Sequence, residues 1–123
     1  MNDRRRRVVG VVDDDLAVCD SLRFLLESAG FSVVTFRSAA QFLAAADTES
    51  VACLLLDQHM PQVSGLELLQ RLRAAGWDVP VALMTGSPSA RLTQQALALG
   101  ATAVLEKPMP EQALLSFIQG AFD

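Results

Sequence analysis

The stretch VACLLL, residues 51–56, has no charged side chain and is followed directly by Asp57. Two other short runs have the same character, VVGVV at residues 8–12 and VALM at residues 81–84. A short run that is apolar throughout, rather than alternating, is typical of a strand that is covered on both faces of a parallel sheet. These three runs therefore predict the centre of an α/β fold.

Helical patterns lie between the strand-like runs. They place apolar residues at three- and four-residue spacing, and we expect capping boxes at Ser38 with Gln41 and at Ser64 with Glu67. The expected strands are residues 7–12, 31–36, 51–56, 80–84 and 101–105. The expected helices are residues 16–29, 38–46, 64–76, 88–99 and 110–122.

Five strand–helix units in alternation predict a doubly wound (βα)5 flavodoxin-like sandwich. Because crossovers between parallel strands are right-handed, few topologies remain, and we expect one parallel five-stranded sheet in the order 2-1-3-4-5. The length of 123 residues suggests a single domain, residues 1–123. An apolar content of 51% is sufficient for a buried core.

Charge and composition narrow the class of function. The chain carries 10 basic and 14 acidic residues, a net charge of −4, so we expect no direct nucleic-acid binding by this domain. The run Arg4–Arg7 is the local exception, which we interpret as a solvated approach to the first strand, with a partner or nucleic-acid contact as the alternative. No apolar stretch approaches the ~20 residues that span a bilayer, and no signal peptide is visible, so we expect no membrane association.

The two cysteines, Cys19 and Cys53, are far apart and lie within apolar patterns. We expect both to be buried and reduced, which fits a cytoplasmic protein. With a single histidine and no closely spaced pair of cysteines, a zinc site is not expected.

Polar side chains follow three of the expected strands at the point where each strand ends. Asp13 and Asp14 follow the first strand, Asp57 follows the third and Thr85 follows the fourth. In doubly wound folds these strand ends meet at one edge of the sheet, where ligands bind. At ~4 Å and an effective dielectric of ~20, each pair of like charges costs about 4 kcal/mol, so the carboxylates must protonate, stay hydrated or bind a cation. Oxygen ligands with room for water favour Mg²⁺.

A lysine, Lys107, lies just beyond the fifth strand, and its long side chain can reach the same edge. A metal would leave one carboxylate oxygen of Asp57 free to act as a nucleophile. The Thr85 hydroxyl can donate to a phosphoryl oxygen. An acceptor, a metal, a cation and a hydroxyl are the groups that phosphoryl transfer requires.

The pattern resembles the receiver domain of bacterial two-component response regulators, over the whole span from Val8 to Phe122. The positions that carry the resemblance are Asp13, Asp14, Asp57, Met60, Pro61, Gly65, Thr85, Lys107 and Pro108. Each short motif is weak alone, but they occur in the right order on five successive strands. The similarity is greatest to the subgroup with a C-terminal helix-turn-helix, judged from Leu-Glu-Leu-Leu at residues 66–69 and Glu-Lys-Pro at residues 106–108.

This resemblance implies a set of roles at the site. Asp14, Asp57 and the main-chain carbonyl of His59 would ligate Mg²⁺, and Asp13 would act mainly through water. Asp57 would accept the phosphoryl group, with Thr85 and Lys107 as its catalytic neighbours. The peptide bond between Lys107 and Pro108 would be cis.

The resemblance also implies a signalling switch rather than a true enzyme. A sensor histidine kinase or phosphotransfer protein would donate the phosphoryl group, the domain would catalyse its own phosphorylation and dephosphorylation, and the acyl phosphate would draw Thr85 inward. The face formed by the fourth helix, fifth strand and fifth helix would then shift, with homodimerisation through the fourth helix and fifth strand as one outcome. The implied setting is the bacterial cytoplasm and the implied output is transcription regulation.

Two departures from the family pattern concern the switch. The family usually has a tyrosine or phenylalanine three residues before the lysine, where this chain has Val104. Without a swinging ring, the signal is either altered or transmitted by Thr85 and the loop before the fourth helix. His59 and Ser87 lie where the family tunes access of water to the phosphoryl group, so His59 is expected to obstruct or orient that water.

Three alternatives stand beside this interpretation. One is a small Mg²⁺-dependent phosphatase with an aspartyl nucleophile, although the acids after the first strand do not form its usual Asp-x-Asp nucleophile motif and no cap domain is present to form a substrate pocket. A flavin-binding electron carrier of the same topology needs a hydroxyl-rich loop where this chain has three acids. The third is a receiver-like interaction module that is never phosphorylated. Taken singly, Asp57 would be a turn former and Lys107 a solvated surface charge.

Overall fold

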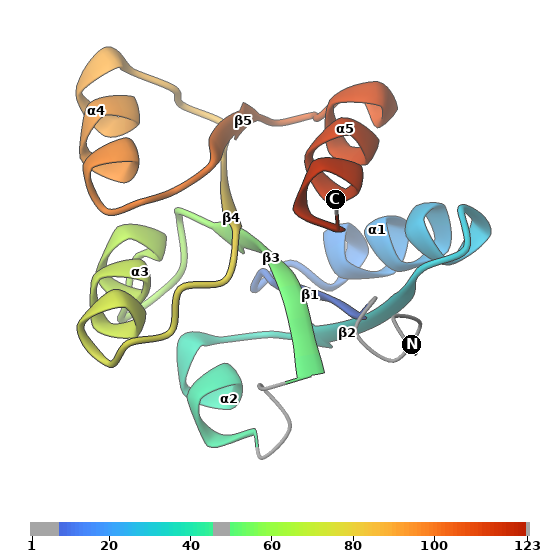
Figure 1. The fold of residues 1–123 in the computed structure, drawn as a ribbon, viewed down its shortest axis with the longest axis horizontal. Helices are drawn as coiled ribbons and strands as arrows, with labels where there is room; N and C mark the ends of the chain where they lie inside the picture. Colours follow the sequence, from blue (N-terminus) through green and yellow to red (C-terminus); the bar gives the residue numbers. More distant parts are fainter. Residues whose placement is uncertain (1–7, 46–49, 123) are drawn as a thin grey trace.

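The computed structural model describes residues 8–45 and 50–122, in which strands and helices alternate along the chain (Figure 1). The strands are β1 Val8–Val12, β2 Ser32–Phe36, β3 Val51–Asp57, β4 Val81–Thr85 and β5 Ala103–Glu106. The helices are α1 Leu16–Ser28, α2 Ala39–Ala44, α3 Gly65–Ala74, α4 Ala90–Ala98 and α5 Glu111–Phe122. The predicted five strand–helix units are confirmed. Arg4–Arg7 and Ala46, on which predictions were also made, lie outside the described residues.

The five strands form one parallel sheet in the order β2-β1-β3-β4-β5, which confirms the predicted topology. The pairing aligns the carboxyl ends of the central strands, since Val12 pairs with Leu56 and Asp57 pairs with Met84. Chain order reverses between β1 and β3, so their ends flank the point where such sheets bind ligands.

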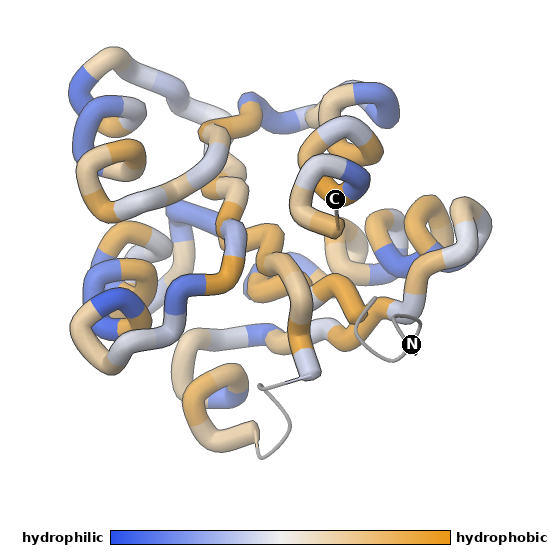
Figure 2. The backbone as a smooth tube through the Cα atoms, in the orientation of Figure 1, coloured by the Kyte–Doolittle hydropathy of each residue, from blue (hydrophilic) through white to orange (hydrophobic). Residues whose placement is uncertain are grey.

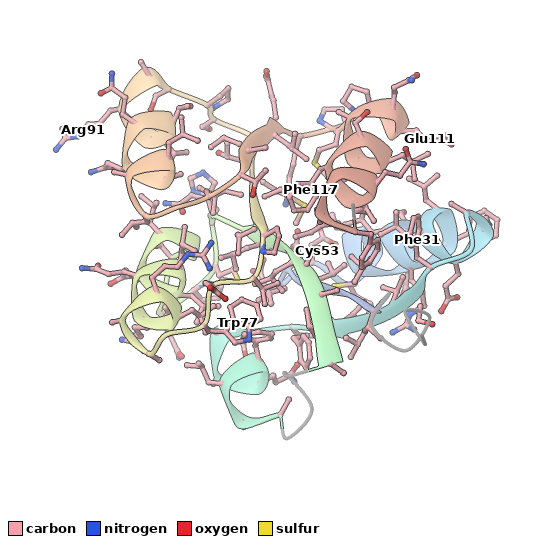
Figure 3. All side chains as sticks on the ribbon, viewed as in Figure 1. Phe31, Cys53, Trp77, Arg91, Glu111 and Phe117 are labelled. Atoms are coloured by element: carbon pink, nitrogen blue, oxygen red, sulfur yellow. The ribbon has the colours of Figure 1, made fainter. Side chains whose placement is uncertain are left out.

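Two apolar layers enclose the sheet. Helices α1 and α5 cover one face, and helices α2, α3 and α4 cover the other (Figure 1). Figure 2 shows apolar residues along the strands and on the helix sides that face them. Cys53 and Phe117 lie within the first layer, whereas Arg91 extends outward from α4 (Figure 3). The predicted double coverage explains why β1, β3 and β4 have no alternation of polar residues.

Both cysteines are buried and free, as predicted. Burial raises the pKa of the Cys53 thiol to about 12, so this sulfur is protonated and unreactive at neutral pH. Burial, and then the charge of Asp13, also raise the pKa of Cys19.

Several predicted boundaries shift by one or two residues. Asp57 is the last residue of β3 rather than the first of a loop, because its backbone still pairs with Met84 on β4. Thr85 likewise ends β4, paired with Glu106. Helix α4 begins only after its cap Ser89, so Pro88 precedes the helix instead of occupying its first turn. The site residues therefore leave from the hydrogen-bonded sheet, which holds them more rigidly than loops would.

The two predicted capping boxes have different outcomes. In α3 the Ser64 hydroxyl accepts from the Glu67 N–H and the Glu67 carboxylate accepts from the Ser64 N–H, which confirms that box. In α2 the Ser38 hydroxyl caps the helix as expected. The Gln41 side chain, however, accepts from the N–H of Arg37, one residue earlier than a capping box requires.

One structural cation was not predicted. The guanidinium of Arg73, on α3, donates to four main-chain carbonyls, those of Trp77, Val79, Leu99 and Gly100, at 3.0 Å each. It thereby ties the end of α3 to the end of α4. From the sequence alone Arg73 is recognisable only as a basic residue near the end of a helix, because its partners lie 4 to 27 positions away.

Gly65, at the start of α3, is expected to be intolerant of a side chain. A Cβ there would lie 2.6 Å from the carbonyl oxygen of Asp57 and 2.9 Å from Cα of Gln58, which are backbone atoms that cannot turn aside. Gly65→Ala should therefore lower the free energy of unfolding by about 1–3 kcal/mol in urea denaturation.

Gly120, in α5, provides the matched control. A Cβ at Gly120 meets no atom within 4 Å. Gly120→Ala should raise the free energy of unfolding by about 0.5–1 kcal/mol, because alanine loses less backbone entropy in a helix. Equal effects of the two substitutions would contradict the close approach of α3 to β3.

Candidate metal and phosphoryl-transfer site

Three carboxylates meet at the carboxyl edge of the sheet. Asp13, Asp14 and Asp57 each place one oxygen within 4.8 Å of the other two. Asp13 is fully buried and Asp57 is 3% exposed, whereas Asp14 is half-buried. The expected convergence of the β1 and β3 ends is thus present in the structure.

Lys107 bridges two of these carboxylates. Its Nζ lies 2.8 Å from Oδ2 of Asp13 and 3.1 Å from Oδ1 of Asp57. Its main-chain N–H donates to the Thr85 carbonyl at 2.8 Å, which holds the start of the β5–α5 loop beside β4. The following peptide bond, to Pro108, is cis, as the resemblance implied. Lys107 is therefore not a solvated surface charge.

The charges of the cluster shift its pKa values. Burial raises the pKa of the Asp57 carboxyl, and the charge of Asp13 raises it further, while Lys107 acts in the opposite direction. Burial alone would lower the pKa of Lys107, but its bonds to Asp13 and Asp57 outweigh burial, and that pKa is raised. Lys107 thus remains a cation at neutral pH, and a further cation would favour ionised Asp57.

The two oxygens of Asp57 differ. Oδ1 contacts Lys107 Nζ and accepts from the His59 N–H at 3.3 Å. Within residues 8–45 and 50–122, no buried side-chain nitrogen or oxygen lacks a partner, and no donor contacts Oδ2. Oδ2 therefore reaches solvent, and it is the oxygen open to an electrophile or a metal.

The cluster fits a divalent metal of the Mg²⁺ type. With all four groups ionised, the three carboxylates and one ammonium sum to a charge of −2, which a divalent cation would neutralise. Its donors are oxygens, which Mg²⁺ prefers, and the half-buried Asp14 leaves room for coordinated water.

Thr85 is fully buried, but its hydroxyl does not contact the acids. Oγ1 accepts from the Ser87 N–H at 3.0 Å and lies 3.2 Å from Nε2 of His59. His59 is exposed in the loop after β3, and Nε2 of its ring approaches the hydroxyl of Thr85. The structure thus separates the predicted residues into an acidic group with Lys107 and a second group of Thr85 with His59.

Two contacts around the acids were not anticipated from the sequence. The Cys19 thiol donates to the main-chain carbonyl of Asp13 at 3.3 Å, and the Arg37 guanidinium donates to that of Asp14 at 3.3 Å. Both hold the loop after β1. Cys19 could have been anticipated from its place on the inner side of α1, six residues after Asp13, whereas Arg37 is 23 residues from Asp14.

Val104, in place of the family's usual ring, pairs with Leu83 on β4 and packs against the α2–α3–α4 layer. It is half-buried. Valine has no ring and so cannot act as the swinging aromatic switch of the family.

Asp15 caps α1, since its side chain accepts from the N–H groups of Ala17 and Val18. It is thereby assigned to the helix and not to the acidic cluster.

Among the described helices, none combines the length and the apolarity that crossing a bilayer requires.

Comparison with known proteins identifies response regulators and transcriptional regulators as similar to this chain. Residues 9–119 match the family model described as the response regulator receiver domain. The chain is 43% identical over 111 residues to the transcriptional regulatory protein FixJ of Bradyrhizobium diazoefficiens, covering 90% of this chain and 54% of FixJ. It is 36% identical over 117 residues to the response regulator protein TodT of Pseudomonas putida, covering 95% of this chain and 52% of TodT. The chain thus spans about half the length of these relatives.

Solved structures share the fold. The response regulator StyR superposes with a TM-score of 0.86 at 43% identity, over 94% of this chain and 58% of StyR. The chemotaxis protein CheY4 of Vibrio cholerae superposes with a TM-score of 0.84 at 28% identity, over 93% of this chain and 97% of CheY4.

Mg²⁺ should stabilise the folded protein in a pH-dependent way. Because the folded-state pKa of Asp57 is raised, ionised Asp57 opposes folding above that pKa, and the opposition disappears as the pH falls through it. Mg²⁺ should therefore raise the melting temperature at pH 7. The increase should fade as protons displace the metal, at a pH above the ordinary aspartate value of 3.8.

The control for this melting experiment is Asp78→Asn, which removes an exposed carboxylate outside the cluster. That variant should keep the Mg²⁺ response, and Asp57→Asn should lose most of it. A melting temperature at pH 7 that ignores Mg²⁺ would exclude the site.

Proposed function

The chain belongs to the response regulator receiver family, and we propose that within it Asp57 is the residue that accepts the phosphoryl group. The observation that supports this most directly is the ammonium of Lys107, held between the buried carboxylates of Asp13 and Asp57. If Lys107 were only a solvated surface charge and Asp57 only a turn former, no cation would have to lie between two buried carboxylates. The cation lies where negative charge would gather on a phosphoryl group attached to Asp57.

The chemistry follows from this arrangement. An Oδ2 lone pair of Asp57 attacks phosphorus in line with the leaving nitrogen of a phosphohistidine, the O–P bond forms, and the N–P bond breaks as histidine regains its nitrogen lone pair. Lys107 neutralises an oxygen of the transferred group. Asp14, Asp57 and the His59 carbonyl would hold Mg²⁺, with Asp13 acting through water, and the bound ion would neutralise phosphoryl oxygens.

The Thr85 hydroxyl would then donate to the phosphoryl group. Later attack of water at phosphorus releases inorganic phosphate and restores the Asp57 carboxylate. The domain is a signalling switch, and we propose that it catalyses both its own phosphorylation and its own dephosphorylation.

A protein donor would lie over the groove beside Lys107. This groove, of about 460 Å³, runs between α1 and the β5–α5 loop, and is lined mainly by apolar residues, including Ala17, Leu25 and Met109. Lys107 lines the groove and also contacts Asp57, so a donor seated there brings its phosphohistidine to the acceptor. The exposed Phe24 lies on the same helix, α1. We propose a sensor histidine kinase or phosphotransfer protein as the donor.

The output is proposed from the relatives. FixJ is named a transcriptional regulator, and about half of its length lies beyond the match. We propose that phosphorylation of this receiver controls transcription through a helix-turn-helix output module in the bacterial cytoplasm, with homodimerisation through α4 and β5 as an accompanying event. On α4, Leu97 is 51% exposed and available for that contact. The acidic receiver itself would not touch DNA.

Asp57→Asn should abolish phosphorylation, because an amide is not a nucleophile toward phosphorus. With Mg²⁺ and a small-molecule phosphodonor, intact mass spectrometry should show one added phosphoryl group in wild type and in Asp78→Asn, and none in Asp57→Asn. An equal gain in Asp57→Asn would assign the phosphoryl group to another residue.

Ala17→Arg should separate the two kinds of donor. The exposed Ala17 lines the groove, and a long charged side chain there should slow transfer from a phosphorylated sensor kinase at least ~10-fold while leaving transfer from the small donor unchanged. Ala74→Arg, an exposed position on α3, is the matched control and should slow neither. Equal slowing of both donors by Ala17→Arg would argue against this docking surface.

A further inference from the structure

The buried hydroxyl of Thr85 has two partners of different kinds. The Ser87 N–H donates to Oγ1 at 3.0 Å, and Nε2 of His59 lies 3.2 Å from the same oxygen. Thr85 is fully buried, and within residues 8–45 and 50–122 its hydroxyl oxygen has no hydrogen-bond partner besides these two. The hydroxyl therefore has a donor at Ser87 and needs an acceptor for its own proton.

Nε2 of His59 is the group that can fill this need. A backbone N–H cannot accept a hydrogen bond, so Ser87 cannot take the Thr85 proton. A buried hydroxyl proton without an acceptor is costly, and proteins avoid it. The geometry points to a neutral His59 ring that carries its proton on Nδ1 and accepts from Thr85 at Nε2.

We propose that His59 is a positioning residue that holds the Thr85 hydroxyl away from Asp57. A phosphoryl group on Asp57 must then compete with Nε2 for the single proton that the hydroxyl can donate. His59 therefore opposes the conformation in which Thr85 binds the phosphoryl group. The contact between His59 and Thr85 is observed independently of any function. Its effect on phosphorylation rests on the proposed function of Asp57.

His59 contacts both Asp57 and Thr85. Its main-chain N–H donates to Oδ1 of Asp57, and its ring meets Thr85. Thr85 in turn accepts from Ser87, in the short segment that leads to Ser89, the cap of α4. Rotation of the Thr85 hydroxyl toward Asp57 thus releases His59 on one side and disturbs the start of α4 on the other. With Val104 too small to follow Thr85, His59 supplies a second path for the signal, through the β3–α3 loop.

The ring proton can be observed directly. In protein labelled with ¹⁵N-histidine, two-bond ¹H–¹⁵N spectra recorded at mildly alkaline pH distinguish the two tautomers of the ring. His59 is the one histidine of the chain, so its signals need no separation from others. We expect protonated Nδ1 and unprotonated Nε2 in the unphosphorylated protein, and a loss of this preference in Thr85→Val. A proton on Nε2 in wild type would overturn the proposal.

The energetic role can be measured by a double-mutant cycle. His59→Leu should speed phosphorylation by a small-molecule phosphodonor about 2- to 10-fold, the range for one hydrogen bond exchanged with water. His59→Gln, whose side-chain carbonyl can accept from Thr85, should lie between wild type and His59→Leu. In a Thr85→Val background the same His59→Leu change should have no effect on the rate. An equal rate increase in both backgrounds would show that His59 acts without Thr85 and would refute the proposal.

The two hypotheses fail separately. If wild-type Asp57 gains no phosphoryl group by mass, the proposed function fails, whereas the tautomer measurement still decides whether His59 accepts from Thr85. If Asp57 is phosphorylated and Nε2 carries the proton, only the inference about His59 fails.

Discussion

The ammonium of Lys107 allows two buried carboxylates to lie side by side. Asp13 and Asp57 are almost completely buried at the ends of adjacent strands, where their charges repel each other. Lys107 contacts both, yet the cluster remains net negative, because Asp14 adds a third carboxylate. The fold thus contains an anionic site that a divalent cation would complete.

Rigid elements hold this unfavourable arrangement in place. Asp57 and Thr85 both leave from paired strand residues, and the main chain of Lys107 is bonded to that of Thr85. Gly65 lets α3 begin against the backbone of Asp57. Because these groups are fixed by the sheet, little rearrangement is needed to bring the charge of Lys107 to the carboxylate of Asp57.

The sheet edge also carries two separate groups of side chains, one that would accept the phosphoryl group and one that would detect it under the proposed function. Asp13, Asp57 and Lys107 form one group of contacts, and Thr85 with His59 forms the other. A hydroxyl can donate only one proton, so Thr85 cannot satisfy His59 and a phosphoryl oxygen at once. That limit turns a local chemical change into a choice between two arrangements, which is the minimum a switch requires. Arg73 anchors the far end of α4, so displacement of that helix would be concentrated at the end near Ser89.

The sequence alone determined the element order, the parallel sheet and the edge at which Asp13, Asp14, Asp57 and Lys107 gather. It did so because fully apolar strands and alternating helices leave few topologies, and polar residues at strand ends follow that topology. Strand ends were misplaced by a residue at Asp57 and Thr85, since the ladder continues past the last apolar side chain. Only the tertiary structure decided that Thr85 meets His59 rather than Asp57, and that Arg73 joins α3 to α4. Those contacts depend on side-chain directions and on partners up to 27 positions apart, for which no local pattern exists.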